Sequence, residues 1–349
     1  MTNIPESAIE LAAQHLRNIL ALCVGHDDLH AAVVVFDSAC PLAVALTAAY
    51  RRALPAANFI DFEANTPEAV LAMLMPLKPA DLVVLIQSSS FRMDEFRVRV
   101  ELFKRGLKVI EHPHLARIKG KESLYYIDAL AYDPAYYRGV GNALKALIDK
   151  ARSGVIDSGG ERLEYASPFE SAKLNIGDYR GMSNIGGQFP IGEVFTEAVD
   201  LQAVNGRVRI FSFGDMAYEV NQPEVPITLV VNEGQVTEVI DSTDEFDRVI
   251  ASIKAAEGVV WVRELGFGMN RAFSKDRTVG AIGTYERMCG VHLSLGAKHG
   301  IYGKPGFKRR DGKYHVDVFA VTESVMLDEQ VIYRDGAWCV GGAMSPAEG

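Results

Sequence analysis

Two kinds of hydrophobic spacing alternate along the first 115 residues of the chain. Short apolar runs rich in β-branched residues predict strands, and they occupy 31–38, 57–63, 80–89 and 107–114. The segments between them carry apolar residues at helical spacing, over 41–54, 66–77 and 93–106. This β-α-β-α-β-α-β order predicts a parallel sheet with helices packed on its faces.

The pattern changes after this region. Gly139 and Gly141 in GVGNALKAL lack the lysine of a phosphate-binding loop, so we interpret them as a helix start. RSGVIDSGGERLE, residues 152–164, has the composition of a linker. We therefore place the domain boundary here, with an α/β domain over 1–155 and a second domain over 156–349.

The second domain is dominated by strands and turns. A strand is predicted over 206–214, and a hairpin over 227–240 that turns at Asn232-Glu233-Gly234. One clear helix is predicted over 244–257, ahead of another apolar strand, 259–265. We expect an α+β domain with a mostly antiparallel sheet.

Composition narrows the classes of partner. The chain of 349 residues is 48% hydrophobic and carries a formal net charge of −9, which argues against nucleic acid. Its one dense basic stretch, 303–313, is bounded by glycines and is typical of a solvated loop. No apolar run reaches membrane-spanning length, the N-terminus resembles an amphipathic helix, and four cysteines are scattered. We expect a cytoplasmic protein that binds neither nucleic acid nor membrane.

GKYHVDVFAV, residues 312–321, places His315 and Asp317 two apart in an apolar run. On a strand these side chains point to the same face, and both are costly to bury. A structural hydrogen bond between them is one explanation. A ligand-binding role is the other, and the pair alone does not decide.

Other apolar strands of this domain also carry isolated groups of metal-ligand type. With the pair above, the candidate ligands are Glu193, Glu264, His292, His315 and Asp317, and Glu197 lies near the end of the first strand. Each alone has a simpler explanation: a carboxylate at a strand end that faces water, or a histidine satisfied within the core. Their recurrence in four segments favours a divalent metal, and three carboxylates with two imidazoles make two ions feasible.

Four of these segments, GEVFTEA, ELGFGMN, HLSLG and YHVDVFAV, resemble the M29 metallopeptidases, the aminopeptidase T family, in order and approximate separation. The resemblance covers about residues 180–340 and is weaker before them. It implies that the five candidate ligands hold two ions, with zinc, cobalt or manganese as candidates. It also implies a homodimer and a small peptide or amino-acid-derived substrate.

The chain departs from the family pattern at two positions. Where the family has a tyrosine seven residues after the first histidine, this chain has His299, with Tyr302 three residues later. An acidic residue is expected five residues before that histidine, where Arg287 stands beside Glu286. By position, the resemblance makes Glu286, His299 and Tyr302 the candidate catalytic residues.

A neighbouring branch, the iron(II)-dependent 2,5-dihydroxypyridine dioxygenases, resembles this chain in length and in the H-x-D ending. That branch has histidine where this chain has Glu264 and no glutamate at the position of Glu193. Both carboxylates favour a metal-dependent hydrolase here. The alternatives are an Fe(II) ring-cleaving dioxygenase and an M29-like metal-binding protein of a specialised pathway without peptidase activity.

Overall fold

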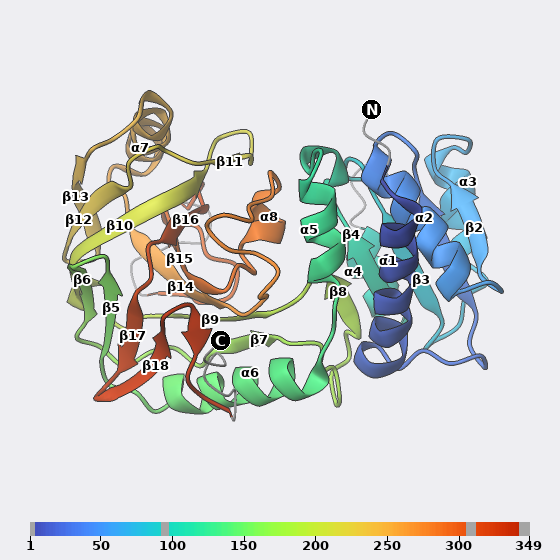
Figure 1. Ribbon diagram of the computed structural model, residues 1–349, viewed down its shortest axis with the longest axis horizontal. Coiled ribbons are helices and arrows are strands. Elements are labelled where there is room, and N and C mark those ends of the chain that lie inside the picture. Colours follow the sequence, from blue (N-terminus) through green and yellow to red (C-terminus); the bar gives the residue numbers. More distant parts are fainter. Residues whose placement is uncertain (1–3, 92–97, 305–311, 342–349) are drawn as a thin grey trace. The chain divides into compact units, whose positions relative to one another are not determined.

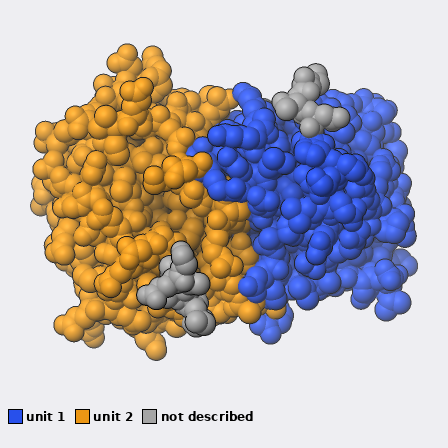
Figure 2. Space-filling view, viewed as in Figure 1, with its two compact units in different colours: residues 1–134, 177–191, 277–284 blue, residues 135–176, 192–276, 285–349 orange. Residues whose placement is uncertain are grey.

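The structure, a computed structural model, describes the chain except residues 1–3, 92–97, 305–311 and 342–349. It divides into two compact units, which Figure 2 colours separately. Unit 1 comprises residues 1–134, 177–191 and 277–284, and unit 2 comprises 135–176, 192–276 and 285–349. The main change of unit therefore falls at 134/135 rather than at 155/156, and unit 1 takes in two short segments from later in the chain.

Unit 1 is built around a parallel sheet with the strand order β2-β1-β3-β4-β8. The bounds of its strands and helices are α1 Glu6–Asn18, the π-helical turn η1 Ile19–Cys23, β1 Ala32–Phe36, α2 Pro41–Ala53, β2 Asn58–Asp61, α3 Pro67–Leu74, β3 Leu82–Ile86, α4 Val98–Lys104, β4 Lys108–His112, η2 Leu115–Arg117, α5 Glu122–Ala129 and β8 Gly186–Gln188. The alternation predicted from the sequence is confirmed. The first residues of the helix expected over 93–106 lie outside the described part.

Helices cover both faces of this sheet, as Figure 1 shows. Val33 and Val35 of β1 pack with Val70 of α3 and Leu102 of α4. Val34 between them is also fully buried, on the opposite face, where α2 contacts β1 and β3. Burial on both faces explains why the strands of unit 1 are continuous apolar runs without alternation.

His112 ends β4 inside the core of unit 1. Its Nε2 lies 2.8 Å from the hydroxyl of Tyr50, and its Nδ1 lies 2.8 Å from that of Tyr126. The side chain is fully buried, and this burial lowers the pKa of His112 to about 3. The imidazole is therefore neutral in the folded protein.

Unit 2 is built on a large, antiparallel sheet of 14 strands within the described residues. Its elements are α6 Pro134–Ile148, β5 Gly154–Ser158, β6 Glu161–Tyr165, β7 Lys173–Asn175, β9 Glu193–Glu197, η3 Leu201–Ala203, β10 Val204–Gly214, β11 Val220–Asn221, β12 Ile227–Asn232, β13 Gln235–Ile240, α7 Asp244–Glu257, β14 Val262–Gly268, β15 Gly290–Leu295, β16 Val316–Ala320, β17 Ser324–Leu327, β18 Gln330–Arg334 and β19 Ala337–Trp338. The short helix α8 spans Ile282–Tyr285. The predicted fold class, a parallel-sheet α/β region followed by a mostly antiparallel α+β region, is confirmed.

Two local predictions were wrong. The segment 152–164 is a β-hairpin, β5–β6, that turns at Gly159 and Gly160, both with positive φ, instead of a linker. The glycines at 139 and 141 lie inside α6, which begins at Pro134, instead of starting a helix. A Cβ at Gly141 would lie 2.5 Å from Cγ2 of Ile176, so this glycine permits close packing of the helix.

No helix among the described residues is long and apolar enough to cross a membrane. Most of the basic stretch 303–313 lies outside the described residues, so its expected exposure as a loop stays a prediction.

Candidate metal centre

Four neighbouring antiparallel strands of unit 2, in the order β9-β14-β15-β16, carry the predicted ligands. The register pairs Glu193 of β9 with Gly268 of β14, and His292 of β15 with Gly266 of β14. Asp317 of β16 pairs with Ser294 of β15. Hydrogen bonding between adjacent strands therefore brings together side chains that are up to 124 positions apart in the sequence.

A glycine makes room for the imidazole at the centre of this group. A Cβ added to Gly266 would lie 2.0 Å from Cε1 and 2.1 Å from Nε2 of His292. The imidazole of His292 therefore occupies the space above β14 that the side chain of any other residue at position 266 would fill. Sequence analysis missed this positioning role, although a glycine inside a strand is a signal of close approach.

The side chains form two groups of donors that share His292. Glu264, His292 and Asp317 form one group, and Glu193, Glu286 and His292 form the other. Within each group one donor atom per residue lies within 4.8 Å of the others. The Nε2 of His292 is 3.3 Å from Oε1 of Glu193 and 3.6 Å from Oε1 of Glu264, so it faces both groups.

Three buried polar atoms of these side chains bear on whether the residues fit a metal ion. His292 Nε2, His299 Nε2 and Asp317 Oδ1 are buried and make no hydrogen bond of acceptable geometry within the described part of the chain. Carboxylate oxygens or an imidazole lie near each of them, but in poor orientation. Buried polar groups are normally satisfied. Imidazole nitrogens and carboxylate oxygens are also the donors that divalent metals take, so the residues fit such an ion.

His315 lies immediately before β16 and is oriented by a backbone carbonyl. Its Nδ1 lies 3.2 Å from the carbonyl oxygen of Lys298, and its Nε2 lies 3.1 Å from Oδ1 of Asp317. The side chain is 29% exposed, whereas Asp317 is buried. An imidazole whose one nitrogen donates to a carbonyl presents the other nitrogen as a metal ligand.

His299 faces the site with a defined tautomer in its neutral form. Its Nδ1 accepts from the backbone amides of Ile301 and Tyr302, at 3.2 and 3.4 Å. An Nδ1 that accepts leaves the proton of the neutral ring on Nε2, which lies 3.0 Å from Oε2 of Glu264. The Nε2 nitrogen of His299 therefore lies close to the carboxylate of a candidate ligand, without the orientation of a hydrogen bond.

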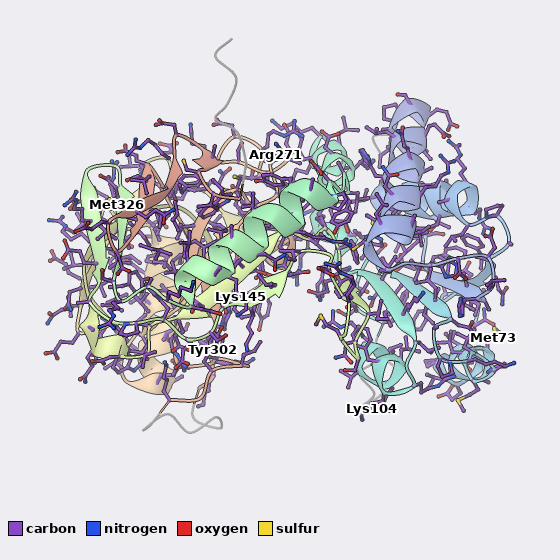
Figure 3. The ribbon with its side chains drawn as sticks, turned by 90° about the horizontal axis from the view of Figure 1, so that it is seen from below. Met73, Lys104, Lys145, Arg271, Tyr302 and Met326 are labelled. Carbon is purple, nitrogen blue, oxygen red and sulfur yellow. The ribbon has the colours of Figure 1, made fainter. Side chains whose placement is uncertain are left out.

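Tyr302 is placed differently from the other candidates. Its hydroxyl donates to the carbonyl of Ser171 at 2.8 Å and lies 3.3 Å from the carbonyl of Phe195. Tyr302 is labelled in Figure 3, which shows its side chain within unit 2. The hydroxyl belongs to neither donor group, and a catalytic role for Tyr302 stays a prediction.

Arg287 enters the site between two carboxylates. Its Nη1 lies 3.3 Å from Oε2 of Glu193 and contacts Oε1 of Glu286. Arg287 is only 5% exposed, and its Nε has no hydrogen-bond partner in the described residues. The sequence signalled this residue only as a departure from an expected acidic position.

The electrostatics of the metal-free site follow from burial opposed by close charges. Burial raises the pKa of Glu286 to about 8, against the opposing effect of Arg287. Burial disfavours the charged form of His315, yet Asp317 raises its pKa to about 10. Burial likewise opposes ionisation of Glu264, but His292 and His299 hold the pKa of Glu264 below its usual value. The metal-free site therefore retains protons that a cation would displace.

A second ion pair nearby is structural. Arg263 binds Glu197 through Nε and Nη2, at 2.6 and 3.0 Å, and both side chains are almost fully buried. Arg263 also donates to the carbonyl of Ala297 at 2.6 Å. This ion pair gives the buried Glu197 a partner without a metal. Because Arg263 pairs with Glu197, it does not pair with Glu264, the next residue in the sequence.

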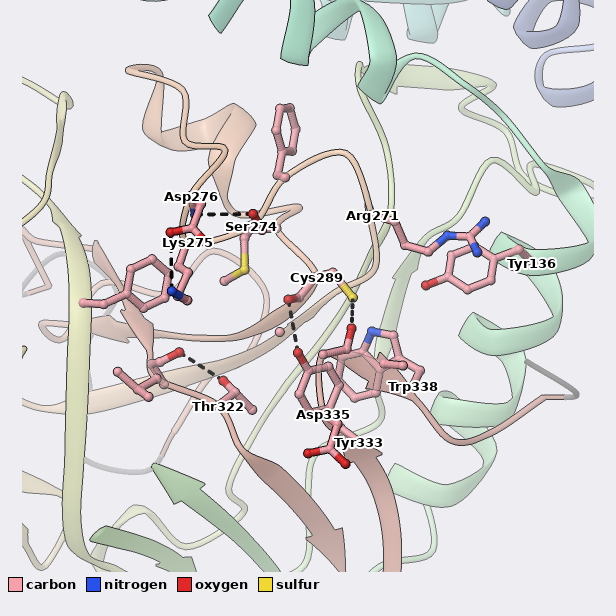
Figure 4. Close-up of a pocket in the computed structure, with 18 residues that line it drawn as sticks. Tyr136, Arg271, Ser274, Lys275, Asp276, Cys289, Thr322, Tyr333, Asp335 and Trp338 are labelled. Atoms are coloured by element: carbon pink, nitrogen blue, oxygen red, sulfur yellow. Dashed lines mark hydrogen bonds and ion pairs between the residues drawn. The ribbon is translucent and has the colours of Figure 1, made fainter. Parts of the chain in front are cut away.

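A cavity of about 820 Å³ lies elsewhere in unit 2, and none of the predicted ligands lines it. Its walls include Phe273, Met288 and Trp338, with Arg271 and Tyr136 stacked together, as Figure 4 shows. The tyrosine hydroxyls in its wall bind backbone carbonyls, Tyr136 to Met269 and Tyr333 to Cys289.

No family model matches the sequence, and no curated protein matches it. Several solved structures share its architecture, including the following two. The 2,5-dihydroxypyridine dioxygenase from Pseudomonas putida KT2440 has a TM-score of 0.61 at 16% identity, over 96% of this chain and 98% of that one. AmpT from Thermus thermophilus has a TM-score of 0.56 at 12% identity, over 95% of this chain and 99% of that one.

The fold is shared with both enzymes. They represent the two groups that the sequence motifs resemble, so that resemblance is confirmed at the level of the fold. Identities of 16% and 12% carry no specific activity over to this chain. The choice between hydrolase and oxygenase depends on the side chains of the site.

Proposed function

We propose that this chain is a metal-dependent hydrolase that cleaves small peptides or amides next to a free amino group. The observation that supports this function best is the donor group of Glu264, His292 and Asp317, within 4.8 Å of one another. Two carboxylates with one imidazole form a set rich in carboxylates. Non-haem iron oxygenases favour two histidines and one carboxylate instead.

A divalent cation at these residues supplies Lewis acidity toward a carbonyl and lowers the pKa of a water molecule. The chain contributes a proton acceptor in Glu286. Burial raises the pKa of this carboxyl to about 8, which brings it near the pH at which a general base is most effective. Its Oε1 contacts Arg287, and this leaves Oε2 to take the proton of the attacking water.

His299 acts as a positioning residue in this mechanism. Its Nε2 lies 3.0 Å from Oε2 of Glu264, while backbone amides hold its Nδ1. A small rotation of the carboxylate would let the Nε2–H donate to this oxygen, and the other oxygen would then remain to bind the cation. The excess of carboxylates also suits a substrate with a protonated amine, because an ammonium group is attracted to them.

One observation favours the second candidate, an iron(II)-dependent ring-cleaving dioxygenase. His315 Nε2 lies 3.1 Å from Asp317 Oδ1, and Asp317 is grouped with His292, so an ion at Asp317 could take two imidazoles and one carboxylate. Glu264 beside them adds a charge that such a site does not need. We therefore rank this function below hydrolysis.

The deciding experiment starts with elemental analysis of protein purified without added metal. Bound zinc, manganese or cobalt together with hydrolysis of leucine or alanine p-nitroanilide supports the hydrolase. Bound iron together with oxygen consumption on 2,5-dihydroxypyridine supports the dioxygenase. Bound metal with neither activity supports a binding protein, and folded protein that binds no metal contradicts both enzymatic functions.

A pair of variants ties the activity to the site. Asp317→Asn removes a charge from the donor group and should abolish both metal retention and hydrolysis, with an unchanged circular dichroism spectrum. Asp276→Asn is the matched control, because the Asp276 side chain is 78% exposed and pairs only with Lys275 in the contacts seen here. Equal activity in the two variants would remove Asp317 from the mechanism.

Two further properties are part of the proposal. By analogy with M29 peptidases we expect a homodimer, which light scattering at micromolar concentration tests, and a monomer there contradicts it. From the scattered cysteines and the N-terminal sequence we expect a cytoplasmic location, which fractionation of the native cells tests.

A further inference from the structure

The two donor groups are not equivalent, because one of them already holds a cation. The Glu193–Glu286 side contains the guanidinium of Arg287, whose Nη1 contacts both carboxylates. Within the described part of the chain, no arginine or lysine forms an ion pair with Glu264 or Asp317. The side chains that lie within ion-pair distance of these two carboxylates are the imidazoles of His292, His299 and His315.

We propose that Arg287 stands in for a second cation and that the centre takes a single divalent ion. The ligands of that ion are Glu264, His292 and Asp317, with His315 at the edge of the group. The inference rests on the metal-binding part of the proposed function and revises the number of ions that the family resemblance implies.

The shared histidine gives the first argument. Nε2 of His292 lies 3.3 Å from Glu193 and 3.6 Å from Glu264. One lone pair on that nitrogen binds one cation, so the two groups cannot both use His292. If His292 ligates the ion on the Glu264 side, the other side keeps two carboxylates and a guanidinium.

The position of the guanidinium gives the second argument. A cation bound to Glu193 and Glu286 would sit about 2 Å from their oxygens. Nη1 of Arg287 lies 3.3 Å from one of these carboxylates and contacts the other, so the cation and the guanidinium would share the same few ångströms. Arg287 is 5% exposed, and solvent does not separate the two charges.

The arginine cannot resolve this conflict by losing a proton. Guanidinium groups stay protonated in proteins, unlike the imidazoles around Glu264. Its planar donors also match carboxylates better than a point charge does. Arg287 therefore places one permanent positive charge between Glu193 and Glu286, whereas the remaining donor group relies on a dissociable cation.

The inference bears on the class of substrate. With neutral imidazoles, one divalent ion and one guanidinium balance the charges of Glu193, Glu264 and Asp317, and the site carries one net negative charge when Glu286 is ionised as well. A substrate with a free ammonium group would bring the net charge of the site to zero, whereas an anionic aromatic substrate would make it more negative. A centre with two ions and Arg287 would carry the opposite net charge and would repel an amine.

The test measures bound metal, not activity. Metal-free wild type, Arg287→Gln and Arg287→Glu are titrated with zinc by calorimetry, and bound zinc is counted after gel filtration. We expect about one ion for wild type and about two for Arg287→Glu, which replaces the cation with a carboxylate. Arg248→Gln is the matched control, because Arg248 is exposed on α7 and pairs with Glu245, and it should bind one ion.

Electron paramagnetic resonance of wild type with two equivalents of Mn²⁺ gives a measurement that does not depend on any variant. Isolated bound Mn²⁺ with the second equivalent free supports the inference. A spin-coupled pair, or two zinc ions in wild type, overturns it and leaves the hydrolase proposal intact. One ion in both wild type and a folded Arg287→Glu protein also overturns the role of Arg287. Wild type that binds no metal instead overturns the proposed function.

Discussion

Gly266→Ala tests the geometry of the metal centre with a change of one methyl group. The new Cβ would lie 2.0 Å from Cε1 and 2.1 Å from Nε2 of His292. Carbon atoms in contact stay about 3.5–4 Å apart, so the imidazole or the strand must move by more than about 1 Å. The conformation of Gly266 itself is not strained, because its φ is not positive, so the effect is purely steric.

A shift of this size exceeds what coordination tolerates. Metal–nitrogen bonds are about 2.0–2.1 Å long, with a tolerance of about 0.2 Å. Displacement of His292 should therefore remove one ligand, and we expect zinc affinity to fall by about 100-fold or more, at the upper end of what loss of a supporting contact costs. Overpacking should also lower the free energy of unfolding of the metal-free protein by about 1–3 kcal/mol.

The assay is zinc titration in competition with a chromogenic chelator, beside urea unfolding of the metal-free protein. Gly303→Ala is the control, because a Cβ there meets no atom of the described residues within 4 Å. The control should keep both the affinity and the stability of wild type. If folded Gly266→Ala binds zinc as tightly as wild type does, His292 is not a ligand in the position described.

Three other perturbations have defined outcomes. Arg263→Gln leaves the buried Glu197 without its partner and should lower the free energy of unfolding by about 3–5 kcal/mol in urea, without changing zinc stoichiometry. Burial lowers the pKa of His112 to about 3, so this imidazole binds no proton in the folded protein near pH 5. In the unfolded chain it binds a proton below about pH 6.5, and the free energy of unfolding therefore falls as the pH drops. Between pH 8 and 5 this costs about 2 kcal/mol, and His112→Gln should flatten that part of the urea-derived pH profile. Burial disfavours the charged form of His315, but Asp317 raises its pKa to about 10. Because His315 must lose this proton to bind a metal, the zinc affinity measured by calorimetry should rise with pH across the neutral range.

The elements that the sequence predicted well are those whose signals are local. The helix over 244–257 has the predicted bounds, because Thr243 accepts from the amide of Phe246 at its start and Gly258 ends it with positive φ. The strands of unit 1 are continuous apolar runs and were found for the same reason. Polar groups in apolar strands likewise exposed the donor residues, since each is costly to bury alone.

Predictions that depended on distant pairing were harder. Strand β8, Gly186–Gln188, has no apolar pattern, and it is a strand because it pairs with β4, more than 70 residues earlier. The hairpin over 152–164 resembled a linker because its two glycines turn the chain. The partner of Arg263 is Glu197, which the register of β9 and β14 brings near, and no spacing rule within one segment indicates it.

The position of Arg287 bears on how the site survives without its metal. Four carboxylates packed together would destabilise the fold if they were all uncompensated. Arg287 adds one permanent positive charge between Glu193 and Glu286, because its proton does not dissociate. Elsewhere in the site the imidazoles of His292 and His315 hold protons in the absence of a cation, and they release these protons when one binds. We therefore expect the protonated imidazoles and the guanidinium to reduce the repulsion among the carboxylates, and the fixed charge of Arg287 to leave one donor group for an incoming ion.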